Sequence, residues 1–96
     1  MKKLFEKGQI VFSKAGHDKG QAFIVVSAEG QYAYIADGRG RKLQNPKKKK
    51  YKHIQISKYI LEDIKEKLES GGYLTDADIR KALSGYVKNT DLKPEL

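Results

Sequence analysis

Residues 8–26 read GQIVFSKAGHDKGQAFIVV, which places two apolar runs on either side of a turn that contains two glycines. The first run, residues 9–13, is rich in β-prone side chains. Gly16 and Gly20 can adopt positive φ angles, so the chain can turn tightly between the runs. The second run, residues 22–27, does not alternate apolar and polar side chains and therefore predicts a strand that is buried on both faces.

Three more short strands are predicted at residues 31–36, 41–43 and 53–55. Glu29-Gly30 is typical of a hairpin turn, and a loop that carries Pro46 separates the last two strands. The short turns favour antiparallel pairing, because parallel strands need long crossover connections. The sequence therefore predicts a mainly β fold with added α structure, in which a small SH3-like antiparallel barrel is followed by two C-terminal helices.

The first of these helices is predicted over residues 57–69. Ser57 is a candidate N-cap, and the glycines after Ser70 end the helix. Apolar side chains recur at a spacing of four residues, which is typical of one helix face. They are Ile56, Ile60, Ile64 and Leu68.

The second helix is predicted over residues 76–87. Thr75 supplies a capping hydroxyl, and Asp76 and Asp78 place acidic groups at the positive end of the helix dipole. An apolar face follows at Ile79, Ala82, Leu83, Tyr86 and Val87. The chain thus divides into a barrel with a basic loop (residues 1–56) and a helical extension packed on it (residues 57–96).

The positive charge is concentrated in the first of these parts. The whole chain of 96 residues has a formal net charge of +8. Residues 1–56 contain thirteen Lys or Arg against four Asp or Glu, a net of +9, whereas residues 57–96 have a net of −1. This distribution indicates a negatively charged partner for the β part, and nucleic acid is the partner class that it favours.

Several function classes are excluded or disfavoured. The absence of cysteine excludes disulfides, thiolate metal sites and cysteine nucleophiles. His17 and Asp18 are neighbours in sequence, which rarely face one another, and no third group completes an acid–base site. No apolar run approaches the ~18 residues of a membrane span. We therefore expect a cytoplasmic protein that is not an enzyme and has no metal, cofactor, small-molecule substrate or membrane partner.

Residues 8–26 also resemble the KOW motif, in which a Gly-x-x-Lys-Gly turn joins two strands. The turn matches Gly16-His17-Asp18-Lys19-Gly20. One departure is Ala22, where many KOW motifs have a further glycine. The motif occurs in ribosomal proteins and in transcription elongation factors of the NusG type. In the turn, Lys19 presents a compact charge that suits a phosphate.

A second block is similar to the fourteenth large-subunit ribosomal protein of archaea and eukaryotes, and to small KOW-domain RNA-binding proteins of some Gram-positive bacteria. It comprises Val25-Val26, Tyr34-Ile35-Ala36-Asp37-Gly38 and the stretch from Pro46 to Ile54. The resemblance spans roughly residues 7–56. It implies an RNA-binding protein that contacts ribosomal RNA or the large ribosomal subunit and takes part in translation, with ribosomal proteins as further candidate partners.

The candidate nucleic-acid-binding residues come from the turn and the basic segments. They are Lys14, Gly16, His17, Lys19, Gly20, Arg39, Arg41, Lys42, Lys47, Lys48, Lys49, Lys50, Lys52 and His53. We expect residues 47–50 to form a solvated phosphate-binding loop whose replacement by alanine leaves folding nearly untouched. Tyr32 and Tyr34 share one strand face, and we favour a core position for them over a base-stacking platform.

Two functions from different classes remain at this point. One is binding of structured RNA through phosphates, by shape rather than by base sequence. The alternative is an SH3-like module that binds proteins of the transcription or translation machinery. The lysine content favours RNA, because protein-binding surfaces are depleted in lysine. Charge alone does not distinguish RNA from DNA.

Overall fold

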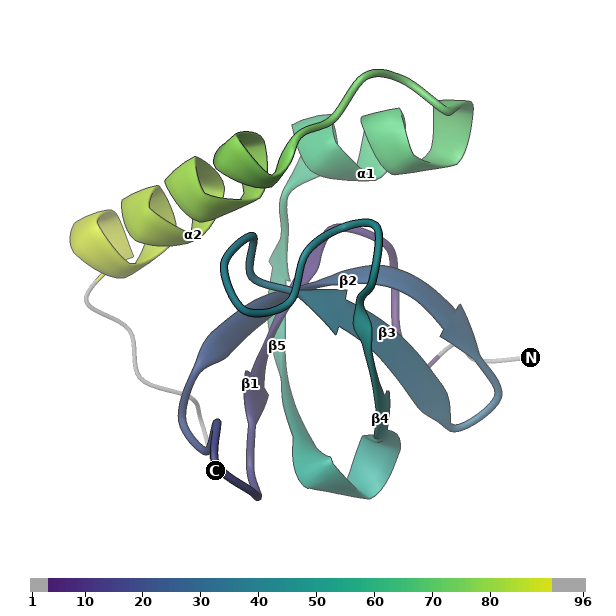
Figure 1. The fold of residues 1–96 in the computed structure, drawn as a ribbon, viewed down its shortest axis with the longest axis vertical. Coiled ribbons are helices and arrows are strands. Elements are labelled where there is room, and N and C mark those ends of the chain that lie inside the picture. The colour runs from purple at the N-terminus through teal and green to yellow at the C-terminus, as the bar shows by residue number, and fades with distance from the viewer. Residues whose placement is uncertain (1–3, 91–96) are drawn as a thin grey trace.

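The glycine turn joins strands β1 (Gln9–Ser13) and β2 (Ala22–Glu29), which pair antiparallel with Val11 opposite Phe23. The computed structural model shown in Figure 1 describes residues 4–90. The remaining strands are β3 (Tyr32–Ala36), β4 (Lys47–Lys50) and β5 (Ile54–Ile60). Their order in the sheet is β4-β3-β2-β1-β5, and every neighbouring pair is antiparallel. The predicted five-stranded antiparallel sheet with two C-terminal helices is confirmed.

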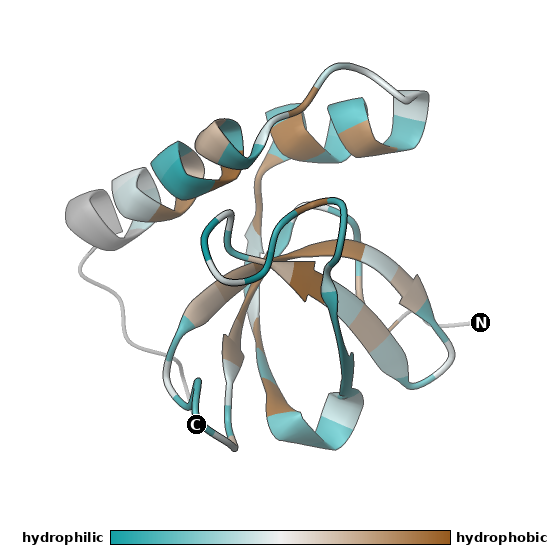
Figure 2. Cartoon of the chain, in the orientation of Figure 1, coloured by the Kyte–Doolittle hydropathy of each residue, from teal (hydrophilic) through white to brown (hydrophobic). Residues whose placement is uncertain are grey.

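The sheet is buried on both faces at its centre. On one face, Val11, Phe23 and Val25 pack in a cluster that also contains Phe5, Ala33, Ile35 and Ile54. On the other face, a second cluster joins Ile10, Phe12 and Ile24 to the helix residues Ile64, Ile79, Leu83 and Tyr86. Figure 2 shows the hydrophobic residues gathered in the strands and on the side of the helices nearest the sheet. The predicted burial of the second strand on both faces is confirmed for Phe23, Ile24 and Val25, whereas Ala22, Val26 and Ser27 are half-buried.

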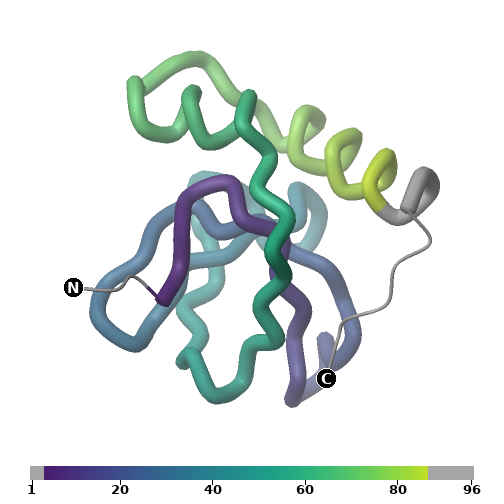
Figure 3. The backbone as a smooth tube through the Cα atoms, turned by 180° about the vertical axis from the view of Figure 1, so that it is seen from behind, coloured from purple at the N-terminus to yellow at the C-terminus, as the bar shows by residue number. Residues whose placement is uncertain are grey.

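The two helices are α1 (Glu62–Ser70), which follows β5 directly (Figure 3), and α2 (Asp76–Thr90). At the predicted start of α2, Thr75 Oγ1 accepts a hydrogen bond from the Asp78 N–H at 3.2 Å, and Asp78 Oδ2 accepts one from the Thr75 N–H at 3.0 Å. This reciprocal cap satisfies two backbone N–H groups at the helix start. The side chain of Val87 lies outside the described residues. Within residues 4–90, no helix combines the length and the apolar character needed to cross a lipid bilayer.

The fourth and fifth strands differ from the prediction. Residues 41–43 lie in the connection between β3 and β4, and the lysine run itself forms β4. A 3₁₀ turn, η1 (Tyr51–His53), precedes β5. Four lysines can form a strand because ladder hydrogen bonds involve only the backbone, and β3 supplies the partner. The expected basic loop is therefore an edge strand.

The first helix begins at Glu62, later than predicted. Ser57 is not its N-cap but part of β5, where its Oγ donates a hydrogen bond to the Ile10 carbonyl at 2.6 Å. Ile56 also lies on β5, opposite Val11 of β1. A spacing of four residues fits a helix face, but it also fits one face of a strand, because four is a multiple of the strand period of two. The pairing with β1 shows that residues 54–60 form a strand and not the start of a helix.

Three glycines shape the turns that matter for the site. Gly16 and Gly20 have φ angles of 89° and 86°, which confirms the predicted positive φ in this turn. Gly38, with φ of 78°, lies against α2, where a Cβ would be 2.9 Å from Arg80 Cγ and would also collide with the Asp76 carbonyl oxygen. Only glycine fits there, so the turn after β3 can pack directly on the first turn of α2.

Candidate nucleic-acid interface

Asp18 lies at the centre of the glycine turn (residues 16–20) and binds two lysines of β4, Lys47 and Lys49. Its Oδ2 accepts a hydrogen bond from Lys47 Nζ at 2.8 Å, and its Oδ1 lies 3.0 Å from Lys49 Nζ and 2.7 Å from Ser13 Oγ. The carboxylate is only 14% exposed. These contacts connect an edge strand of the sheet, β4, to the turn at the end of β1.

Lys49 is buried, with only 8% of its side chain exposed. Besides Asp18, its ammonium donates to Ser13 Oγ at 2.8 Å and to the Ala15 carbonyl at 2.9 Å. The three donors of the ammonium therefore all have protein partners. Lys49 is a structural residue, because reaching a phosphate would break all three bonds.

The pKa of Asp18 reflects this environment. Burial alone would raise the pKa of the carboxyl, but the hydrogen bonds from Lys47, Ser13 and Lys49 outweigh it and hold the pKa well below its usual range. Asp18 therefore stays ionised at neutral pH, and its charge offsets part of the positive charge of β4.

The lysines of β4 alternate between two environments. Lys49 lies opposite Ala33, whose side chain belongs to the core, whereas Lys48 lies opposite Tyr34 and is exposed. Successive side chains of a strand point to opposite faces, so Lys48 and Lys50 lie on the outer face. The expectation of four equivalent solvated lysines is wrong. Because Lys47 and Lys49 bind Asp18, we now expect their replacement to lower the stability of the fold.

Tyr32 and Tyr34 are not core residues, contrary to the prediction. Ala33 and Ile35 of the same strand are fully buried, whereas Tyr32 is 37% exposed and Tyr34 is half-buried. Lys48 Nζ lies 4.5 Å from the centroid of the Tyr32 ring. The prediction failed because Ala33 and Ile35 of β3 point into the core while the two tyrosines point outward. Side-chain size alone suggested the reverse arrangement.

The glycine turn and η1 lie next to each other and carry exposed cations. The Lys14 N–H donates to the His53 carbonyl at 2.8 Å, which joins the two segments. Lys14, His17, Lys19 and Lys52 are exposed, and His53 is half-buried. Within residues 4–90, none of these five side chains takes part in an ion pair.

A second basic group occupies the connection at the other end of β4. Arg39, Arg41 and Lys42 are exposed there. Asp37 shapes the start of this connection. Its Oδ1 accepts hydrogen bonds from the N–H groups of Arg39 and Arg41 at 2.9 and 3.0 Å, and its Oδ2 accepts one from the Gln21 side chain. Arg39, Arg41 and Lys42 thus lie in the connection that precedes β4, and the bond between Asp37 and Gln21 joins this connection to the residue after the glycine turn.

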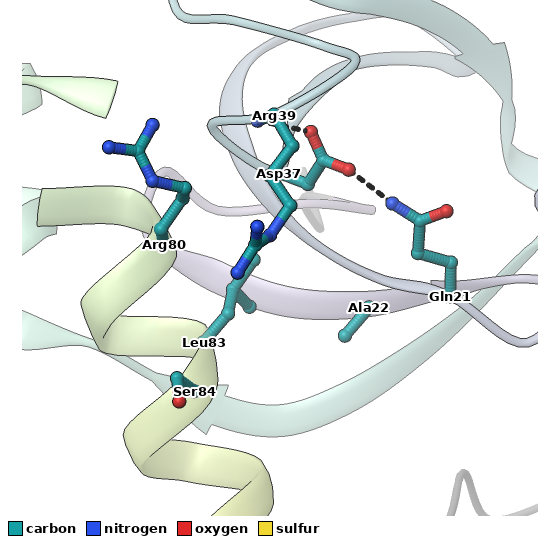
Figure 4. Close-up of a pocket in the computed structure, with 7 residues that line it drawn as sticks. All are labelled: Gln21, Ala22, Asp37, Arg39, Arg80, Leu83 and Ser84. Carbon is teal, nitrogen blue, oxygen red and sulfur yellow. Dashed lines mark hydrogen bonds between the residues drawn. The ribbon is translucent and has the colours of Figure 1, made fainter. Parts of the chain in front are cut away.

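A shallow pocket of about 400 Å³ lies between this second group and α2 (Figure 4). Arg39 and Arg80 line it from the turn and from the helix. Arg80 Nη1 donates to the Gly38 carbonyl at 2.7 Å, so this guanidinium is already engaged in packing the turn against α2.

The carboxylates of the β part are mostly engaged within the protein. Asp18 and Asp37 are described above, and Glu6 pairs with Lys65 of α1 at 3.2 Å. Glu29 is the fourth carboxylate of residues 1–56, and it is exposed. Thirteen Lys or Arg against these four carboxylates leave residues 1–56 with a net charge of +9, which favours a polyanionic partner.

No protein-family model matches the sequence, and no curated protein matches it. Among the described residues, no group of three or more His, Cys, Asp or Glu side chains could hold a metal ion.

Asp18 provides a test of the network through acid unfolding. Because its pKa is lower in the folded protein than the ordinary value near ~3.9, its contribution to stability is complete above about pH 4 and is lost as the pH falls further. Asp18→Asn should lower the free energy of unfolding at pH 7 by roughly 2–4 kcal/mol, because two lysines lose their counter-charge. Urea titrations at pH 7 and near pH 2 should show the difference from wild type shrinking in acid.

Glu29→Gln is the matched control. This exposed carboxylate is expected to change the free energy of unfolding by no more than about 0.5 kcal/mol at either pH. An equal deficit of Asp18→Asn at both pH values would contradict an electrostatic role for the Asp18 carboxylate.

Proposed function

We propose that the protein binds RNA, and specifically ribosomal RNA, through a basic surface formed by the glycine turn, η1 and the outer side of β4. One observation supports this most strongly: Asp18 of the glycine turn is paired with Lys47 and Lys49, while Lys14, Lys19 and Lys52 are exposed without an ion-pair partner in residues 4–90. A polyanion releases counterions when it meets such a surface, which favours binding.

The contacts in this proposal are mainly to phosphates. Lys19 and Lys52 supply point charges at the surface. A-form RNA hides base edges in its deep major groove, so binding to duplex regions depends on shape and backbone. Protein-binding surfaces are depleted in lysine at their centre, so this surface is less suited to a protein partner.

We also propose that the five-stranded sheet is an SH3-like barrel of the KOW type. The sheet curls far enough for Lys47 and Lys49 of β4 to reach the turn after β1, which supports a barrel-like arrangement. The resemblance of residues 7–56 to KOW-domain ribosomal proteins supports ribosomal RNA as the ligand within this class.

The salt dependence of RNA affinity tests the proposal. Replacing Lys19 and Lys52 by alanine should flatten the slope of log Kd against log salt concentration by roughly 1.4–1.8, because each lost phosphate contact removes about 0.7–0.9. The measurement is fluorescence anisotropy with a labelled stem-loop RNA across a salt series.

The matched control is the double variant Lys67→Ala/Lys81→Ala, which removes the same charge from exposed positions on α1 and α2. Its slope should stay within about 0.5 of wild type. If both double variants flatten the slope equally, only net charge matters and the proposed surface is wrong. If no RNA binds at low salt, the protein-interaction alternative takes its place.

Sedimentation of a tagged protein through a gradient of cell lysate tests the ribosomal part. We expect co-migration with the large ribosomal subunit and release at high salt, since phosphate contacts weaken as salt rises. Migration with other RNA would leave RNA binding intact and remove ribosomal RNA from the proposal.

A further inference from the structure

The outer face of β3 and β4 carries two aromatic and two cationic side chains in register. Tyr32 lies opposite Lys50, and Tyr34 lies opposite Lys48. Directly opposite residues of paired strands point to the same side of a sheet, so these four side chains share one face. We call it the β3–β4 face. The opposite side of the same strands holds Ala33, Ile35 and the buried Lys49.

The tyrosines on this face have few contacts within the protein. Among the described residues, the ring of Tyr32 interacts with Lys48, and Tyr34 has no hydrogen bond, ion pair or ring contact. Both side chains are partly exposed although apolar core space lies on the other face of the same strand. A pair of aromatic rings held at a rigid strand, flanked by lysines, is the arrangement that stacks bases and neutralises phosphates.

We propose that the β3–β4 face binds unpaired bases of single-stranded RNA by stacking on Tyr34 and Tyr32, with Lys48 and Lys50 contacting the phosphates. The inference rests on the proposed RNA-binding function and specifies a second mode of contact within it. The glycine turn and η1 bind phosphates alone, whereas the β3–β4 face requires bases that are free to stack.

The geometry favours single strands over a duplex. Residues two apart on a strand lie about 6.6–6.8 Å apart, roughly twice the spacing of about 3.4 Å between successive stacked bases of a nucleic-acid strand. Rings at this separation suit bases that are spread apart rather than stacked on each other. Stacking on a tyrosine also needs an open base face, which a duplex interior does not offer.

The charges give the bound strand a preferred side. Glu29 of β2 is exposed and lies opposite Tyr32 on the β2 side, whereas Lys48 and Lys50 flank the tyrosines on the β4 side. Repulsion from Glu29 and attraction to the lysines place the phosphates along β4. The bases then extend over β3, where the rings are.

The test compares three labelled RNAs by fluorescence anisotropy: a short oligoadenylate, the same strand with abasic sites in place of the bases, and a blunt-ended duplex without unpaired bases. Wild type should bind oligoadenylate at least about 5-fold more tightly than the abasic strand, because stacking contributes to each bound base. Tyr34→Ala should weaken oligoadenylate binding by about 5-fold or more and leave binding of the duplex and the abasic strand unchanged.

Three further variants separate stacking from folding and charge. Tyr34→Phe keeps the ring and should retain wild-type affinity for oligoadenylate, which also guards against a folding defect in Tyr34→Ala. Tyr73→Ala removes an aromatic side chain that is 84% exposed in the α1–α2 connection and should change nothing. Glu29→Gln should strengthen oligoadenylate binding, since it removes the repulsion at the edge of the face.

The outcomes distinguish this inference from the broader proposal. Equal affinity of wild type for the oligoadenylate and the abasic strand, or no effect of Tyr34→Ala, would overturn base stacking while duplex binding stands. Failure of all three RNAs to bind would instead overturn RNA binding itself. Capture of a protein partner that Tyr34→Ala abolishes, with RNA affinity intact, would assign the β3–β4 face to protein recognition.

Discussion

The ion pairs between Asp18 and the lysines of β4 constrain the whole β part of the protein. β4 lies at one edge of the sheet, and β3 and β2 separate it from β1. Lys47 and Lys49 nevertheless connect β4 to the β1–β2 turn through the Asp18 carboxylate. Because Lys49 is buried, loss of Asp18 would leave its ammonium without a counter-charge in a poorly hydrated place. The network therefore holds β4 against the β1–β2 turn. The register of β4 on β3 places Lys47 and Lys49 on the inner face, and Lys48 and Lys50 face outward because strand side chains alternate.

Local signals in the sequence predicted the centre of the fold. The two glycines of the turn have the expected positive φ, the strand after them is buried on both faces, and Thr75 begins α2 with a reciprocal cap. Each of these features depends on a few neighbouring residues, such as a glycine that tolerates left-handed backbone or a hydroxyl that accepts a helix N–H. Such features can be identified without knowing what packs against them.

Much of the candidate site could not be predicted from the sequence, because it depends on tertiary contacts that no local sequence pattern encodes. A run of four identical lysines has no alternation in its sequence, so the division into buried Lys49 and exposed Lys48 becomes visible only when β3 pairs with β4. Asp18 gave one usable signal, an acid inside a basic turn, but its partners are about thirty residues away in the chain. Tyr34 was predicted to lie in the core, whereas this strand fills its core side with Ala33 and Ile35.

Lysine footprinting with an acylating reagent, read by mass spectrometry with and without stem-loop RNA, tests this division most directly. An exposed lysine reacts through its small fraction of neutral amine, whereas a buried, hydrogen-bonded ammonium is held protonated and out of reach of the reagent. Lys49 should be acylated slowly in both samples, whereas Lys19, Lys48 and Lys52 should be acylated quickly in the free protein and become protected by RNA. The account would be contradicted if Lys49 reacted as fast as Lys48 in the free protein, or if RNA protected none of the exposed lysines.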